Sequence, residues 1–159
     1  MSALAALLVT ITAAVAPLAN APAGERAHAA GKATSRPALS VSTSSRYGRY
    51  LVDRRGLTLY LFTKEATRRS ECYGACAAAW PPYLVKPGER LTVGRGLRRS
   101  RIGTTRRSDG SRQVTYAGHP LYHYVSERHA GEIFCQNVNE YGGDWLIVNP
   151  NGRPNRTPH

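Results

Sequence analysis

Residues 56–80, GLTLYLFTKEATRRSECYGACAAAW, form the stretch that decides the fold. It opens with a run, 57–62, in which Leu alternates with Thr, Tyr and Phe, so both faces of a strand here are largely apolar. Such a strand is central in a sheet or covered on both sides. A polar loop follows, then two cysteines spaced C-x3-C and an alanine-rich segment that ends at Trp-Pro-Pro. We expect one short helix near 72–80, because alanine favours helix and the prolines stop it.

The neighbouring segments predict further strands and turns. Residues 50–53 precede Arg54-Arg55-Gly56, a turn that joins them to the run 57–62 as a hairpin. Asp109-Gly110 lies between 101–107 and 112–117 and is the strongest hairpin signal in the chain. Short strands are also expected at 83–85, 121–125 and 145–148.

The layout of the first stretch returns about sixty residues later. A shift of 62 residues places Tyr60 on Tyr122 and Glu65 on Glu127 without a gap. Each copy has the order hairpin, Tyr-x4-Glu, loop, Cys, Trp, strand, Pro/Gly turn. Other aligned pairs, some after inserted residues, are Val52 and Val114, Gly56 and Gly118, Leu59 and Leu121, Phe62 and Tyr124, Cys72 and Cys135, and Trp80 and Trp145. We predict a mainly β, compact antiparallel domain of two pseudo-symmetric repeats, each with a hairpin and a Cys/Trp loop, sharing one core.

Four segments carry a resemblance to a known family: LVDRRGLTLYLFTKE, CYGACAAAWPP, DGSRQVTYAGHPLYHYV and NEYGGDWLIV. They resemble the bacterial secreted or lipoprotein repeats of unknown function that carry a Tyr-x4-Asp motif in tandem copies. The resemblance covers nearly all of residues 47–152 and implies an extracytoplasmic location with no assigned activity. Two departures stand out: Glu65 and Glu127 replace Asp, and no cysteine for a lipid anchor precedes Cys72.

The N-terminal segment has features of an export signal. Residues 3–15 are almost purely apolar or Thr, short for a membrane span and long enough for a signal-peptide core, although no Lys or Arg precedes them. Small residues favour cleavage near Ala29 or Ala30. We expect a signal peptide over 1–30, a flexible Ser/Thr/Ala/Pro-rich linker over 31–45 and the duplicated domain over 46–152, with repeats at about 46–88 and 108–152, followed by a loose tail at 153–159.

The three cysteines, Cys72, Cys76 and Cys135, leave two arrangements for a disulfide. Cys72 and Cys76 bridge within their loop, or one of them joins Cys135 and closes a loop of about sixty residues, which stabilises more. A sharper hypothesis is a metal or redox site, because sulfurs one helical turn apart suit copper or zinc. His119 and His123 share a strand face and are candidate further ligands. We expect no cofactor, with copper or haem as the alternative.

The two Tyr-x4-Glu motifs are a candidate polar site. Five residues along a strand place the two side chains on opposite faces, so Tyr60 and Glu65, like Tyr122 and Glu127, meet only where the loop turns back. We expect the tyrosines to pack in the core and the acids to cap or latch the following loop. A tyrosine–carboxylate acid/base site is the alternative, but no nucleophile or oxyanion hole accompanies it. No catalytic residue is therefore assigned.

The chain is strongly basic, with a formal net charge of +12. Between Arg90 and Arg112 eight arginines accompany a single acid, Asp109, and such a segment either binds polyanions or is a solvated hairpin. No nucleic-acid recognition module is visible. The candidate patch consists of Arg95, Arg98, Arg99, Arg101, Arg106 and Arg107.

These patterns favour an exported cell-envelope protein that is not an enzyme. We expect a binding or structural module whose basic surface engages an anionic cell-wall polymer or an envelope protein, with no specific nucleic-acid partner and no transmembrane segment in the mature chain. The alternative is an extracytoplasmic redox or metal-handling protein, associated with electron transfer, that uses Cys72, Cys76 and Cys135.

Overall fold

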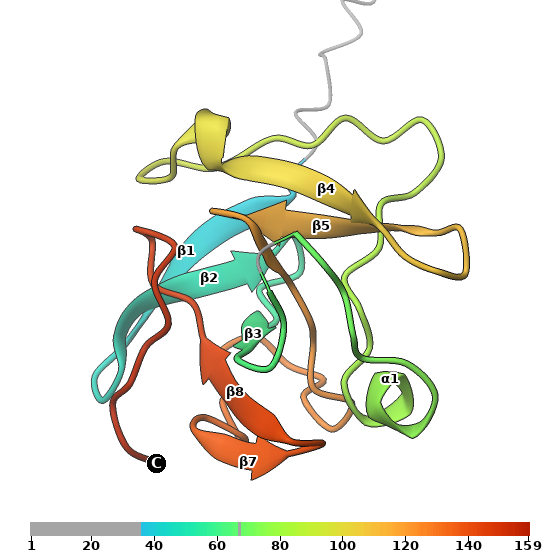
Figure 1. Ribbon diagram of the computed structural model, residues 1–159. Coiled ribbons are helices and arrows are strands. Elements are labelled where there is room, and N and C mark those ends of the chain that lie inside the picture. Colours follow the sequence, from blue (N-terminus) through green and yellow to red (C-terminus); the bar gives the residue numbers. More distant parts are fainter. Residues whose placement is uncertain (1–35, 67) are drawn as a thin grey trace, which may run out of the picture. The chain divides into compact units, whose positions relative to one another are not determined.

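The computed structural model describes residues 36–66 and 68–159 (Figure 1). In this part of the chain, antiparallel strands form sheets with the orders β1-β2, β3-β8-β7 and β4-β5-β6, accompanied by a short helix, α1. The mainly β prediction is confirmed. The elements are β1 (Leu39–Ser44), β2 (Gly48–Asp53), β3 (Tyr60–Phe62), α1 (Ala75–Ala79), the 3-10 turn η1 (Arg99–Arg101), β4 (Ile102–Arg106), β5 (Arg112–Tyr116), β6 (His119–Pro120), β7 (Val138–Glu140) and β8 (Gly143–Ile147).

The first sheet corrects the predicted linker. Residues 1–35, which include the predicted signal peptide, lie outside the described part of the chain. From Leu39 to Ser44, however, the predicted linker is strand β1, paired with β2 along its whole length. Leu39 is fully buried, and its backbone also exchanges hydrogen bonds with Thr92 and Gly94. The sequence LSVSTS alternates apolar and polar residues, and Val and Thr favour strands, so the composition was that of a linker but the period was that of a strand.

The predicted hairpin between 50–53 and 57–62 has the expected turn, but its second strand pairs mainly with a distant strand. Asp53 N donates to Leu57 O at 2.9 Å, and the Asp53 carboxylate accepts from the backbone N–H groups of Arg55 and Leu57. Pairing with β2 continues only as far as Leu59, whose N–H donates to Leu51 O at 3.1 Å, and β3 does not extend it. It pairs instead with β8, with Leu61 opposite Leu146, so a strand of the first repeat lies beside a strand of the second.

The strand at 57–62 is buried on both faces, as its alternation predicts. Every residue of this run is at most 6% exposed. Leu59 and Leu61 pack into one hydrophobic cluster, whereas Tyr60 and Phe62 pack into a second cluster built around two tryptophans. The run therefore separates two halves of the core.

The second repeat confirms the hairpin at Asp109-Gly110. Strands β4 and β5 pair along their whole length, with Ile102 opposite Tyr116 at one end and Arg106 opposite Arg112 at the other. Gly110 takes the positive φ that this turn requires. The segments predicted as strands at 83–85 and 121–125 make only isolated bridges, such as Pro82 with Tyr122, beside which Tyr83 N donates to Leu121 O at 2.9 Å. The predicted helix near 72–80 is present as the five-residue α1.

The C-terminal residues correct the predicted loose tail. Pro154 bridges Val148, and Asn155 is only 6% exposed. Asn155 Nδ2 donates to Tyr47 O at 2.8 Å, and its own carbonyl accepts from Gln136 Nε2 at 2.8 Å. Residues 154 and 155 are thus anchored because a buried amide satisfies the backbone of the β1–β2 turn.

Candidate functional site

The two Tyr-x4-Glu motifs meet at the centre of the domain, with their partners exchanged between repeats. Tyr60 and Tyr122 form an antiparallel bridge in which each backbone N–H donates to the other carbonyl, at 2.9 and 3.0 Å. The Tyr60 hydroxyl donates to the Glu127 carboxylate, and the Tyr122 hydroxyl donates to the Glu65 carboxylate. Each tyrosine therefore pairs with the acid of the other repeat, which local spacing did not reveal.

Each glutamate also holds the loop that follows it. Glu65 Oε1 accepts from the backbone N–H of Glu71, and Glu127 Oε1 accepts from that of Phe134, both at 2.8 Å. These two donors each precede the aligned cysteine of their repeat. The predicted loop latch is present in both copies, and the matched geometry places a pseudo-twofold axis between the tyrosines.

The environment of these carboxyls favours the neutral form. Glu65 and Glu127 are less than 10% exposed, and the Oε2 atom of each has no hydrogen-bond partner among the described residues. Burial raises the pKa of Glu127 to about 7 against the opposing hydrogen bonds from Tyr60 and Phe134. Burial likewise raises the pKa of Glu65. Burial and the facing carboxylates raise the pKa of both tyrosines, so the hydroxyls keep their protons and act as donors.

The tryptophans complete the symmetric centre. Trp80 and Trp145 are fully buried and stack with ring centroids 4.0 Å apart and planes 3° from parallel. Tyr60 meets Trp80 edge-on at 5.1 Å, and Tyr122 meets Trp145 edge-on at 5.2 Å. The aligned Trp residues are therefore core residues that join the repeats, and the cluster is closed to a ligand.

The cysteines adopt the local arrangement. Cys72 and Cys76 form a disulfide at the start of α1, and Cys135 is a free, half-buried thiol. Burial raises the pKa of Cys135, which keeps it protonated and weakly nucleophilic at neutral pH. The disulfide removes two of the candidate metal ligands.

The candidate histidines do not join the cysteines. His123 Nε2 lies 3.2 Å from Asp53 Oδ2 beside the first hairpin turn. Burial alone would raise the pKa of Asp53, but the hydrogen bonds from His123 and from two backbone N–H groups lower it to about 2. His119 lies in β6, and burial lowers its pKa. Across residues 36–66 and 68–159, no three His, Cys, Asp or Glu side chains are grouped closely enough to hold a metal ion.

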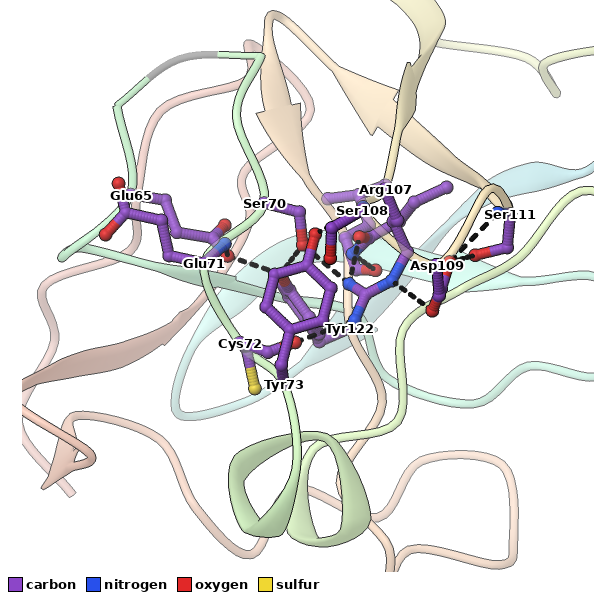
Figure 2. A network of polar contacts seen from close by, with 12 residues as sticks. Glu65, Ser70, Glu71, Cys72, Tyr73, Arg107, Ser108, Asp109, Ser111 and Tyr122 are labelled. Atoms are coloured by element: carbon purple, nitrogen blue, oxygen red, sulfur yellow. Dashed lines mark hydrogen bonds and ion pairs between the residues drawn. The ribbon is translucent and has the colours of Figure 1, made fainter.

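Arg107 corrects the predicted basic patch, because its side chain is buried rather than on the surface. Figure 2 shows its guanidinium among polar groups of the first repeat, including Ser70 and the Cys72 carbonyl. It donates to Ser70 Oγ at 2.5 Å, to Gln113 Oε1 at 2.8 Å and to Cys72 O at 2.7 Å, and it covers the ring of Tyr73. On strand β4 and its extension, residues 103, 105 and 107 share the inward face, which is why this arginine points inward.

The network around Arg107 reaches the crossed pairs. Ser70 Oγ also bonds the Tyr122 hydroxyl at 2.8 Å, so Arg107, Ser70, Tyr122 and Glu65 form one continuous chain of polar contacts (Figure 2). Sequence reasoning missed Ser70 and Gln113, because neither belongs to a charged or repeated motif. The one pattern that could have identified Gln113 is its position on β5: it follows exposed Arg112, so its side chain lies on the opposite, inward face of the strand.

The rest of the predicted patch is at the surface. Arg95, Arg98, Arg99 and Arg106 are exposed, and Arg101 is half-exposed. Two of the side chains are anchored to backbone carbonyls, Arg99 to Leu91 at 2.8 Å and Arg101 to Asn151. These side chains come from the segment before β4 and from the end of β4, where no acid other than Asp109 occurs between residues 90 and 112.

The comparisons with known proteins agree with the internal repeat. A family model described as a secreted repeat of unknown function matches residues 41–83 and 103–149, more than half of the chain and one match for each predicted repeat. No curated protein and no solved structure matches. In the part of the chain that the structure describes, no helix is long and apolar enough to cross a membrane. The resemblance noted from the motifs is confirmed: the chain belongs to the family of secreted repeats of unknown function.

Proposed function

We propose that this secreted repeat protein is a non-enzymatic binding module of the cell envelope that engages an anionic wall polymer through its arginine-rich segment. Export by the N-terminal signal peptide would deliver it to that polymer. The proposal includes no cofactor and no specific nucleic-acid partner.

The observation that carries the proposal is the charge left exposed in residues 90–112. Asp109 Oδ2 lies 3.5 Å from the buried Arg107 guanidinium, so the only acid of the segment is already paired. Seven arginines then remain without an acid in the same segment. Unopposed positive charge at a surface attracts polyanions over roughly a Debye length, about 10 Å at 0.1 M salt.

The burial and pairing of the four Tyr-x4-Glu side chains support a role that is not enzymatic. Tyr60, Tyr122, Glu65 and Glu127 are buried, and each tyrosine is hydrogen-bonded to the glutamate of the other repeat, which suits a structural role. The alternative of a redox or metal-handling protein depended on three cysteines, of which two are joined as a disulfide. We therefore favour binding over redox chemistry.

The test is salt-dependent retention of the purified protein on isolated cell walls. Arg95→Ser, Arg98→Ser and Arg99→Ser together should lower the NaCl concentration that elutes the protein. The matched control replaces three exposed arginines outside the segment, Arg46, Arg128 and Arg156, by serine, and so removes the same charge. Equal elution of the two triple variants would contradict the proposal, because net charge alone would then explain retention.

A further inference from the structure

A cavity beside the arginine-rich segment has the features of a site for a single anionic group. It lies over the paired strands β4 and β5, is bordered by Arg68 and by the η1 turn, and has a volume of about 560 Å³. We call it the Gly103 pocket. Its polar or charged lining residues are Arg68, Ser100, Arg101, Thr104 and Thr115, with Gly103 between them.

The floor of the Gly103 pocket is open because a strand residue lacks a side chain. Gly103 is directly opposite Thr115 in the β4–β5 ladder and does not have a positive φ, so its backbone does not require glycine. A Cβ on Gly103 would lie 3.1 Å from Thr115 Oγ1. Glycine inside a strand weakens the strand and often marks a place where a ligand approaches closely.

The hydroxyl under this opening is available to a ligand. Thr115 is only 4% exposed, lines the pocket, and its Oγ1 makes no hydrogen bond to the residues that the structure describes. Unlike the Oε2 atoms of Glu65 and Glu127, this oxygen is not fully enclosed, so it can be reached from the pocket. Here an incoming oxygen acceptor would satisfy it.

The walls supply positive charge from the first repeat and from the segment between the two matched repeats. Arg68 comes from the loop after Glu65, and its backbone is held by Gly118 O at 2.5 Å and by the Thr105 hydroxyl. Arg101 is anchored by one nitrogen to Asn151 O, which leaves its other donors free. No Asp or Glu lines the pocket. Two guanidinium groups without an acid select an anion.

The arrangement of donors favours phosphate over carboxylate. Arginines on two walls and the Thr115 hydroxyl on the floor offer donors from several directions, which suits a tetrahedral group with oxygens on every side better than a planar one. A smaller cavity, of about 260 Å³ and lined by Arg98 and Arg101 among others, adjoins the first at Arg101. Two neighbouring anionic subsites with a shared arginine suit a chain with repeated charges.

We propose that the Gly103 pocket binds one phosphodiester group of a polyol-phosphate polymer, and that Arg101 lies between two successive phosphates of the chain. This inference rests on the proposed function and specifies its ligand. Arg68 and Arg101 neutralise the bound phosphodiester, and the Thr115 hydroxyl donates a hydrogen bond to it through the gap left by Gly103.

The experiment measures binding of soluble polyglycerol phosphate to the purified protein by calorimetry at low salt. Gly103→Val places a side chain against the Thr115 hydroxyl without changing charge, and Thr115→Val removes the hydroxyl at nearly constant shape. Each should weaken binding about tenfold, the loss expected for one charge-assisted contact. Thr43→Val, the same change at an exposed position of β1, is the matched control and should bind like the wild type. Circular dichroism checks that each variant is folded, and Thr115→Val keeps the test decisive if Gly103→Val does not fold.

The outcomes separate this inference from the proposed function. If both pocket variants bound the polymer like the wild type and the Arg95/Arg98/Arg99 triple variant bound it more weakly, the pocket would not be the binding site. The proposed function would still stand. No polymer binding by the wild type, together with inorganic phosphate shifting the amide NMR signals of Gly103 and Thr115, would overturn the polymer as the ligand; the proposed function would fall only if the wild type were also not retained on isolated cell walls. Binding to phosphatidylglycerol vesicles alone, abolished by Thr115→Val, would overturn the polymer in favour of a lipid surface.

Discussion

The crossed glutamates predict an unusual dependence of stability on pH. Burial raises the pKa of Glu127 from 4.5 to about 7, so the folded protein holds this proton more tightly than the unfolded chain does. The contribution of Glu127 to stability is therefore complete below pH 4.5 and is lost as the pH rises through 7. One pKa unit corresponds to 1.36 kcal/mol, so the loss attributable to Glu127 is about 3 kcal/mol.

The perturbation that tests this is Glu127→Gln. The amide is neutral at every pH in this range, and its oxygen can still accept from the Tyr60 hydroxyl and from Phe134 N. The free energy of unfolding would be measured by urea denaturation from pH 4.5 to 8, followed by the fluorescence of the two buried tryptophans. The wild type should lose about 3 kcal/mol more of its free energy of unfolding between pH 4.5 and 8 than the variant does.

A second glutamate, Glu71, provides the control. Glu71→Gln removes a charge from an exposed glutamate of the loop that follows Glu65, in the other repeat, and should leave the pH profile close to that of the wild type. Parallel profiles for wild type and Glu127→Gln would refute the reasoning, since they would mean that Glu127 titrates alike in the folded and unfolded chain. Glu65→Gln should flatten the profile in the same direction, because burial raises that pKa too.

Three further predictions concern stability. Arg107→Met should destabilise the protein by about 2–4 kcal/mol in urea denaturation, because it leaves buried acceptors unpaired, whereas the exposed Arg106→Met should change stability by less than about 0.5 kcal/mol; equal effects would contradict the buried network. Replacing Cys72 and Cys76 together by alanine should cost only about 2 kcal/mol, since the loop they close is short; loss of folding at 25 °C would argue against this estimate. Gly143→Ala should lower the melting temperature by several degrees, because a Cβ there would lie 2.9 Å from a backbone nitrogen; an unchanged melting temperature would exclude this close packing.

The sequence predicted the elements of the fold better than their pairing. The alternation at 57–62 gave a strand with two apolar faces, because side-chain period is a local property. Its partner β8 lies more than eighty residues away, and no local pattern specifies it. Strand β1 was missed because its Ser and Thr residues resemble a linker, although their alternation with Leu39 and Val41 is that of a strand.

In the candidate sites, too, contacts within one repeat could be predicted from the sequence, whereas contacts between the repeats could not. The loop latch by Glu65 and Glu127 was predictable, because acids just after a strand commonly bond nearby backbone N–H groups. The exchange of tyrosine partners was not, because a five-residue spacing describes only contacts within one repeat. Arg107 was assigned to the surface on the basis of charge, whereas its inward position follows from alternation along β4. The Gly103 pocket was missed because a strand glycine carries no charge or repeat signal.

The exchange of partners between repeats also determines when the chain can fold. The Tyr60–Glu127 and Tyr122–Glu65 contacts join residues 67 and 57 positions apart, and β3 gains its ladder only from β8. During synthesis from the N-terminus, β1 and β2 can pair as soon as both have emerged, but β3 has no ladder partner and its two apolar faces stay uncovered until the second repeat is complete. Contacts so distant in sequence make folding slow and concerted rather than stepwise. A chain cut after the first repeat should show the circular dichroism of a coil, and both halves should become resistant to protease at the same moment.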